Sequence, residues 1–151
     1  MSEPEFEITK SATFDAAHFL PAGPEDSLYR RMHGHSFKVE ATVRGHAQEP
    51  VGWVADLAGL DTALRGVASE LDHSTLNDKA GLESPTLERL CLYFVARLKP
   101  SYPGLCQIVV SRPTIGESCA LKVQTSSPHS PPKDVSPCCS LIVPALWPQS
   151  P

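Results

Sequence analysis

The chain has 151 residues, 41% of them hydrophobic and 20% charged, and a formal net charge of −4. This length suits one domain with a packed core and leaves little room for a second. The acidic balance argues against a nucleic-acid partner or an anionic membrane surface, and no apolar run approaches the ~20 residues that cross a bilayer.

The N-terminus and the cysteines both favour the cytoplasm. The first ten residues are acidic and lack the apolar segment of a signal peptide. The five cysteines are irregularly spaced and form no CxxC pair. We therefore expect reduced thiols in a cytoplasmic protein.

Two alternating segments predict strands that each bury one face. In the first, Phe6, Ile8, Ala12, Phe14 and Ala16 share one parity, and His18 falls on the same apolar side. The second alternates in the same way from 33 to 44, with His33 and His35 on its apolar side. The stretch between them, 19–32, has the composition of a loop.

Apolar residues at helical spacing follow. The first helix is expected over 57–71 with Asp56 as its N-cap, and the second is expected to start at Ser84-Pro85 and to end at Lys99-Pro100. Two more strands are expected at 107–111 and 119–123. The order β-β-α-α-β-β predicts an α+β domain, with two helices on one face of a four-stranded antiparallel sheet.

The composition changes at residue 124. Seven prolines and six serines fall within 124–151, and no periodicity survives there. We expect residues 1–123 to form the domain and 124–151 to be a disordered Pro/Ser-rich tail.

Three histidines form the most informative cluster. His33 and His35 are two residues apart on a strand and so share a face. If the two strands pair as a hairpin, His18 joins them at one end of the sheet. Three imidazoles with an open fourth position are the pattern of a catalytic zinc site, although spacing alone leaves open three unrelated histidines.

Two further motifs are weaker by themselves. Asp72 next to His73 can orient the ring and make it a general acid or base, or His73 can simply complement a helix C-terminus. Thr86 stands at the start of a helix, where free N–H groups can bind a polar ligand or merely be capped.

Five strings together resemble the superfamily of 6-pyruvoyltetrahydropterin synthase and 6-carboxytetrahydropterin synthase. They are FDAAHFL at 14–20, RRMHGHSF at 30–37, GWVADL at 52–57, LDHSTLND at 71–78 and SPTLERL at 84–90. Both their order and their spacing match, and the resemblance covers about residues 5–123.

The resemblance implies the tunnelling fold, in which sheets of three subunits close into a barrel and two trimers stack into a hexamer. It implies that His18, His33 and His35 bind Zn²⁺, which holds the side-chain oxygens of dihydroneopterin triphosphate. Asp72 and His73 would transfer protons, reaching the site from a neighbouring subunit, and Thr86 would lie in the pterin pocket.

Two positions depart from the family pattern. Tyr29 stands four residues before the first histidine of HGH, where the family has a catalytic cysteine and a related subgroup a glutamate. Glu25 and Asp26 lie in the same loop as possible substitutes. The family's pterin-anchoring glutamate, usually in an ET dipeptide after the third strand, is replaced by Ser111-Arg112-Pro113-Thr114, and Glu117 is our candidate replacement.

The expected function is a zinc-dependent lyase that converts 7,8-dihydroneopterin triphosphate to 6-carboxytetrahydropterin in the queuosine pathway. The alternatives are a 6-pyruvoyltetrahydropterin synthase, a side-chain cleavage that gives a hydroxymethylpterin, or a pterin-binding homologue that lost the synthase reaction with its cysteine. All of these expect a small pterin ligand and a homo-oligomer, either a trimer or a hexamer.

Overall fold

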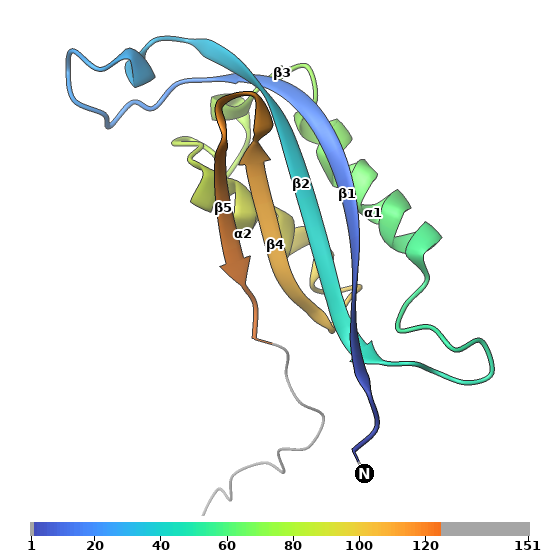
Figure 1. Ribbon diagram of the computed structural model, residues 1–151. Coiled ribbons are helices and arrows are strands. Elements are labelled where there is room, and N and C mark those ends of the chain that lie inside the picture. Colours follow the sequence, from blue (N-terminus) through green and yellow to red (C-terminus); the bar gives the residue numbers. More distant parts are fainter. Residues whose placement is uncertain (1, 125–151) are drawn as a thin grey trace, which may run out of the picture.

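The computed structural model describes residues 2–124, which form one sheet with two helices packed against one of its faces (Figure 1). The strands are β1 (Glu5–His18), β2 (His33–His46), β3 (Ser74–Thr75), β4 (Leu105–Arg112) and β5 (Glu117–Lys122), and the helices are α1 (Leu57–Leu71) and α2 (Leu87–Leu98). Short 3-10 turns lie at Leu28–Arg30 (η1), Leu76–Asp78 (η2) and Pro113–Ile115 (η3). The expected α+β class is confirmed.

The sheet has one strand more than expected. Its order is β3-β1-β2-β4-β5, and β3 runs parallel to β1 through Ala16↔Ser74 and Ala17↔Thr75. The prediction of a four-stranded, wholly antiparallel sheet was therefore wrong. Two residues are too few to show the alternation that identifies a strand in a sequence.

The first residues of the two helices can be compared with the N-caps predicted from the sequence. Asp56 caps α1, with its carboxylate accepting from the N–H of Ala58 at 2.9 Å, as expected. The predicted start of the second helix was two residues too early, because Thr86 is the N-cap and its hydroxyl accepts from the N–H of Arg89 at 3.3 Å. Pro85 keeps Ser84 out of the helical conformation, and a threonine after the proline offers a cap of its own.

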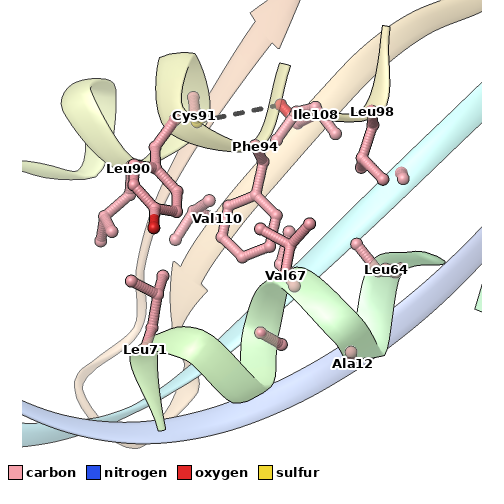
Figure 2. Packing of buried hydrophobic residues seen from close by; sticks show 14 of the residues in the cluster. Ala12, Leu64, Val67, Leu71, Leu90, Cys91, Phe94, Leu98, Ile108 and Val110 are labelled. Atoms are coloured by element: carbon pink, nitrogen blue, oxygen red, sulfur yellow. Dashed lines mark hydrogen bonds between the residues drawn. The ribbon is translucent and has the colours of Figure 1, made fainter. Parts of the chain in front are cut away.

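The core lies between the two helices and the sheet (Figure 2). Leu64, Val67 and Leu71 of α1 and Leu90 and Phe94 of α2 bury their apolar faces against the sheet, as the helical spacing predicts. Phe14 of β1 stacks on Phe37 of β2 with ring centroids 5.0 Å apart. This packing fixes which face of the β1–β2 hairpin is buried.

Residues 125–151, which hold almost all of the expected tail, lie outside the described part of the chain. Within residues 2–124 no helix is long and apolar enough to cross a membrane.

The fold generates a prediction at Gly104, which precedes β4. Its carbonyl accepts from the N–H of Arg44 at 2.9 Å, and a Cβ there would stand 2.5 Å from the Arg44 carbonyl oxygen. Gly104→Ala must push backbone away from backbone, so we expect urea unfolding to show a loss of about 1–3 kcal/mol.

The matched control is Gly66→Ala within α1, where nothing lies within 4 Å of the added methyl group. That variant should gain about 0.5–1 kcal/mol from helix propensity. Equal stability of the two variants would show that the contact at Gly104 costs nothing.

Candidate metal centre and ligand cavity

The three histidines meet where the β1–β2 ladder ends. His18 is the register partner of His33, and His35 lies two residues further along the same face of β2. One ring nitrogen from each lies within 4.8 Å of the others, close enough for the group to hold a metal ion. The sequence-based expectation that His18, His33 and His35 converge is confirmed.

His18 is prepared for a metal by its surroundings. The side chain is buried, its Nδ1 lies 3.2 Å from the carbonyl oxygen of Pro85, and its Nε2 is buried with no hydrogen-bond partner among residues 2–124. A proton on Nδ1 satisfies the carbonyl and leaves the Nε2 lone pair facing the other two rings. Burial, reinforced by the neighbouring histidines and Arg112, lowers the pKa of His18 to about 4, so the ring is neutral at physiological pH.

The other two rings differ in their outer contacts. His33 places Nδ1 2.6 Å from the carbonyl oxygen of Arg31, the same kind of backing as at His18. His35 instead has its Nε2 3.3 Å from the guanidinium of Arg112. Burial and then the charge of Arg112 lower the pKa of His35. Three imidazoles, two of them backed by carbonyl oxygens, fit a divalent metal.

Two pockets that share three lining residues border the histidines, and we call them the helix lobe and the loop lobe of the cavity. The helix lobe, about 380 Å³, is lined by His18, Leu20, Pro85, Thr86, Leu87, Glu88, Ser118 and Cys119 together with Tyr29, Arg112 and Glu117. The loop lobe, about 350 Å³, is lined by Leu28, Arg31, Met32, His33, His35 and Ile115 together with the same Tyr29, Arg112 and Glu117. The three shared residues therefore stand where the lobes meet.

The structure brings both proposed pterin-binding residues to this cavity. Thr86 lines the helix lobe while its hydroxyl caps α2. Glu117 begins β5 and borders both lobes, and its carboxylate lies 2.7 Å from Nη2 of Arg112. Tyr29 also lines both lobes, whereas Glu25 and Asp26 line neither.

The Asp72–His73 pair lies elsewhere. Asp72 accepts from the N–H of Asp15 at 2.8 Å and holds Nδ1 of His73 at 2.9 Å, but the His73 side chain is 82% exposed. His73 borders a surface hollow that Asp15, Ser36 and the proposed ligand His35 also line, and it lines neither lobe. Within one protomer, the pair is therefore not part of the cavity.

Sequence reasoning overlooked two residues. Arg112 was noted only as a departure from the family pattern, although a cation where an acid is expected was a usable signal. Asn77, inside the string LDHSTLND, ties two loops together: its amide donates to the carbonyls of Phe19 at 2.8 Å and Glu83 at 3.1 Å and accepts from the N–H of Phe19 at 3.0 Å. It thus holds the chain next to His18 and close to Pro85.

Comparisons with known proteins agree with this geometry. The family model described as 6-pyruvoyl tetrahydropterin synthase matches residues 7–124. The 6-carboxy-5,6,7,8-tetrahydropterin synthase of Synechocystis sp. is 35% identical over 131 residues, covering 83% of this chain and 96% of that protein. The dihydroneopterin monophosphate aldolase of Pyrococcus furiosus is 34% identical over 97 residues, covering 64% of this chain and 78% of that protein.

The fold is shared with solved structures. The 6-pyruvoyl tetrahydropterin synthase of Caenorhabditis elegans superposes with a TM-score of 0.69 at 21% identity, covering 82% of this chain and 99% of that one. The Plasmodium vivax 6-pyruvoyltetrahydropterin synthase superposes with a TM-score of 0.62 at 18% identity, covering 79% and 98%.

The clamp formed by Asn77 gives a testable prediction. Asn77→Ala removes two donors and one acceptor from partly buried backbone groups, so we expect a loss of about 1–3 kcal/mol in unfolding free energy. Because the clamp holds the chain around His18, we also expect affinity for Zn²⁺, measured against a chelating dye, to fall about 10-fold or more. Asp78→Ala, at the exposed neighbouring position, is the control and should leave both quantities unchanged.

Proposed function

Because the chain belongs to the 6-pyruvoyl tetrahydropterin synthase family, we propose that it is a zinc-dependent lyase that converts 7,8-dihydroneopterin triphosphate to 6-carboxytetrahydropterin, a step of the queuosine pathway. The observation that carries the proposal is the buried Nε2 of His18, which has no hydrogen-bond partner among residues 2–124 and belongs to a cluster with two other imidazoles. The 6-carboxytetrahydropterin synthase among its relatives, matched over 83% of this chain, supports the choice of reaction.

His18, His33 and His35 would hold the zinc ion. Nitrogen ligands and an open fourth position suit Zn²⁺, which when bound supplies a Lewis acid for the hydroxyl and carbonyl oxygens of the substrate side chain. The carbonyl oxygens of Pro85 and Arg31 fix the orientation of two of the rings.

Glu117 and Thr86 would bind the pterin ring. The ring presents amino and amide N–H groups on one edge, and a carboxylate accepts two such hydrogen bonds side by side. Glu117 is the acid shared by both lobes, and Thr86 lies in the helix lobe with it. Arg112 holds the Glu117 carboxylate at 2.7 Å and so limits its rotation.

Asp72 and His73 would transfer protons in an oligomer. In one protomer the pair is exposed and lines neither lobe, so we place it at the cavity of a neighbouring subunit. The edges of the sheet favour such assembly: beyond its two pairs with β3, β1 is paired on one side only, and β5 is the opposite edge strand. We propose a homotrimeric barrel or a hexamer of two such trimers.

A second candidate is cleavage of the pterin side chain to a hydroxymethylpterin. The aldolase relative of Pyrococcus furiosus favours it, as does Tyr29, which stands at the meeting of the lobes in place of the family's thiol. Both reactions need the same metal and the same ring anchor, and they differ in which groups move protons.

The test of the proposed function is incubation of the zinc-loaded protein with 7,8-dihydroneopterin triphosphate and mass analysis of the product. We expect one zinc ion per protomer and formation of 6-carboxytetrahydropterin. The double variant His33→Ala, His35→Ala should lose both, because one imidazole cannot retain the metal. A hydroxymethylpterin product would establish the second candidate, and retention of metal by a folded double variant would refute the assignment of the ligands.

The Asp72–His73 pair gives a pH prediction. The hydrogen bond to Asp72, and then its negative charge, raise the pKa of His73. The protonated ring therefore persists to higher pH than in an ordinary histidine, and Asp72→Asn should shift its titration to lower pH. NMR titration of the His73 ring protons measures this, with His46 at the far end of β2 as an internal control. An unchanged titration would show that the carboxylate does not act on the ring.

The proposed assembly is tested by sedimentation equilibrium. At micromolar concentration we expect the mass of a trimer or a hexamer, because closure into a barrel pairs the open edges of β1 and β5. A monomer would contradict the assembly and would leave Asp72 and His73 without a cavity to serve.

A further inference from the structure

The two lobes of the cavity differ in charge. The helix lobe is lined by Glu88 and Glu117, together with Arg112. The loop lobe is lined by Arg31 and Arg112, and Glu117 is the acid among its lining residues. The lobe that borders His33 and His35 is therefore the more positive one, even before a divalent metal is added.

Arg112 is the cation that both lobes share. Its side chain is only 15% exposed, and Nη2 lies 2.7 Å from the carboxylate of Glu117. Nη1 lies 3.3 Å from Nε2 of His35, and Nε is buried without a hydrogen-bond partner among residues 2–124. A half-buried guanidinium whose partners in this part of the chain are one carboxylate and one imidazole has unused capacity to donate.

A metal at the histidines must change this arrangement. If His35 binds the metal through Nε2, the lone pair that accepts from Arg112 is used. If it binds through Nδ1, a neutral ring carries its proton on Nε2, and two donors then face each other. Either way Nη1 of Arg112 loses its acceptor and, beside a divalent cation, requires an anion.

We propose that Arg112, assisted by Arg31, forms an anion subsite beside the metal that binds the phosphate ester on the side chain of the pterin ligand. This inference rests on the proposed function. In dihydroneopterin triphosphate the phosphate is carried by the carbon next to a hydroxyl-bearing one, so a ligand with its hydroxyls at the metal places its first phosphate only a few bonds from the metal. Arg112 then touches both ends of the ligand: the ring through Glu117 and the phosphate directly.

The experiment compares two fluorescent probes, neopterin and neopterin triphosphate, which share the oxidised ring and differ only in the phosphates. Both are titrated into the zinc-loaded full chain and into Arg112→Gln. A charge-assisted hydrogen bond to phosphate is typically lost at a cost of about 10- to 100-fold in affinity. We expect that loss for neopterin triphosphate and no more than about a twofold change for neopterin.

Two controls define the origin of the effect. Arg65→Gln removes the same charge from the exposed surface of α1, where Arg65 pairs with Asp61, and should leave both affinities unchanged. Zinc affinity is measured for Arg112→Gln and for the double variant Arg112→Gln, Glu117→Gln. In the double variant, the Glu117 carboxylate that Arg112 no longer holds cannot account for the zinc affinity. Because Arg112 competes for His35, zinc should bind these variants at least as tightly as the parent.

Equal weakening of the two probes by Arg112→Gln would overturn the proposal, since Arg112 would then act only by holding Glu117. An unchanged affinity of Arg112→Gln for neopterin triphosphate, or a loss of zinc from this variant, would also overturn the proposal. If the proposed function is wrong, neither pterin binds the parent protein, and this result differs from the outcomes above. Inorganic phosphate titrated into the zinc form would then decide the subsite: weaker binding to Arg112→Gln supports it and equal binding refutes it.

Discussion

The antiparallel ladder between β1 and β2 is the constraint on which the site depends. It extends over all 14 residues of each strand and ends with the pair His18↔His33. Because side chains alternate along a strand, a slip of β2 by one residue would turn His33 and His35 to the face opposite His18. The stacked rings of Phe14 and Phe37, close to the histidines on the same buried face, resist such a slip. Core packing therefore sets where the metal ligands lie.

Burial at the end of this ladder suits His18 to be a metal ligand. An imidazole that loses water without a partner for both nitrogens is costly, and among the described residues only Nδ1 of His18 has a partner. The same burial keeps the ring neutral, which is the form that binds a metal. The loop from η2 to α2 supplies the carbonyl of Pro85, and Asn77 ties that loop to the chain after His18. The two halves of the site are thus joined by hydrogen bonds between segments far apart in sequence.

The long strands, the helices and the histidine cluster could be predicted from the sequence, because they follow from the period and spacing of apolar residues and histidines. Alternation located β1 and β2, helical spacing located α1 and α2, and the parity of His18, His33 and His35 predicted their convergence. Features set by long-range geometry could not be predicted in the same way. β3 is too short to alternate, and Arg112 meets Glu117 only because η3 ends at Gly116 with φ 70° and reverses the chain. The local sequence around Asp72 and His73 does not indicate that the pair lies outside the cavity. Their position depends on how the chain runs from α1 to the edge of the sheet.

The division between the cavity and the Asp72–His73 pair bears on how one metal site can serve different reactions. Relatives that resemble this chain at 34–35% identity carry the names of a synthase and an aldolase, so a shared scaffold does not by itself determine the product. Metal and ring anchor orient the ligand in either reaction, and the outcome depends on which group removes or returns each proton. Tyr29 stands within the cavity where both lobes meet, whereas His73 would enter from a neighbouring subunit. In the proposed assembly, one protomer therefore binds and orients the ligand, and its neighbour supplies a proton-transfer group. In this proposal, the reaction would depend on whether the Tyr29 phenol or that imidazole moves each proton.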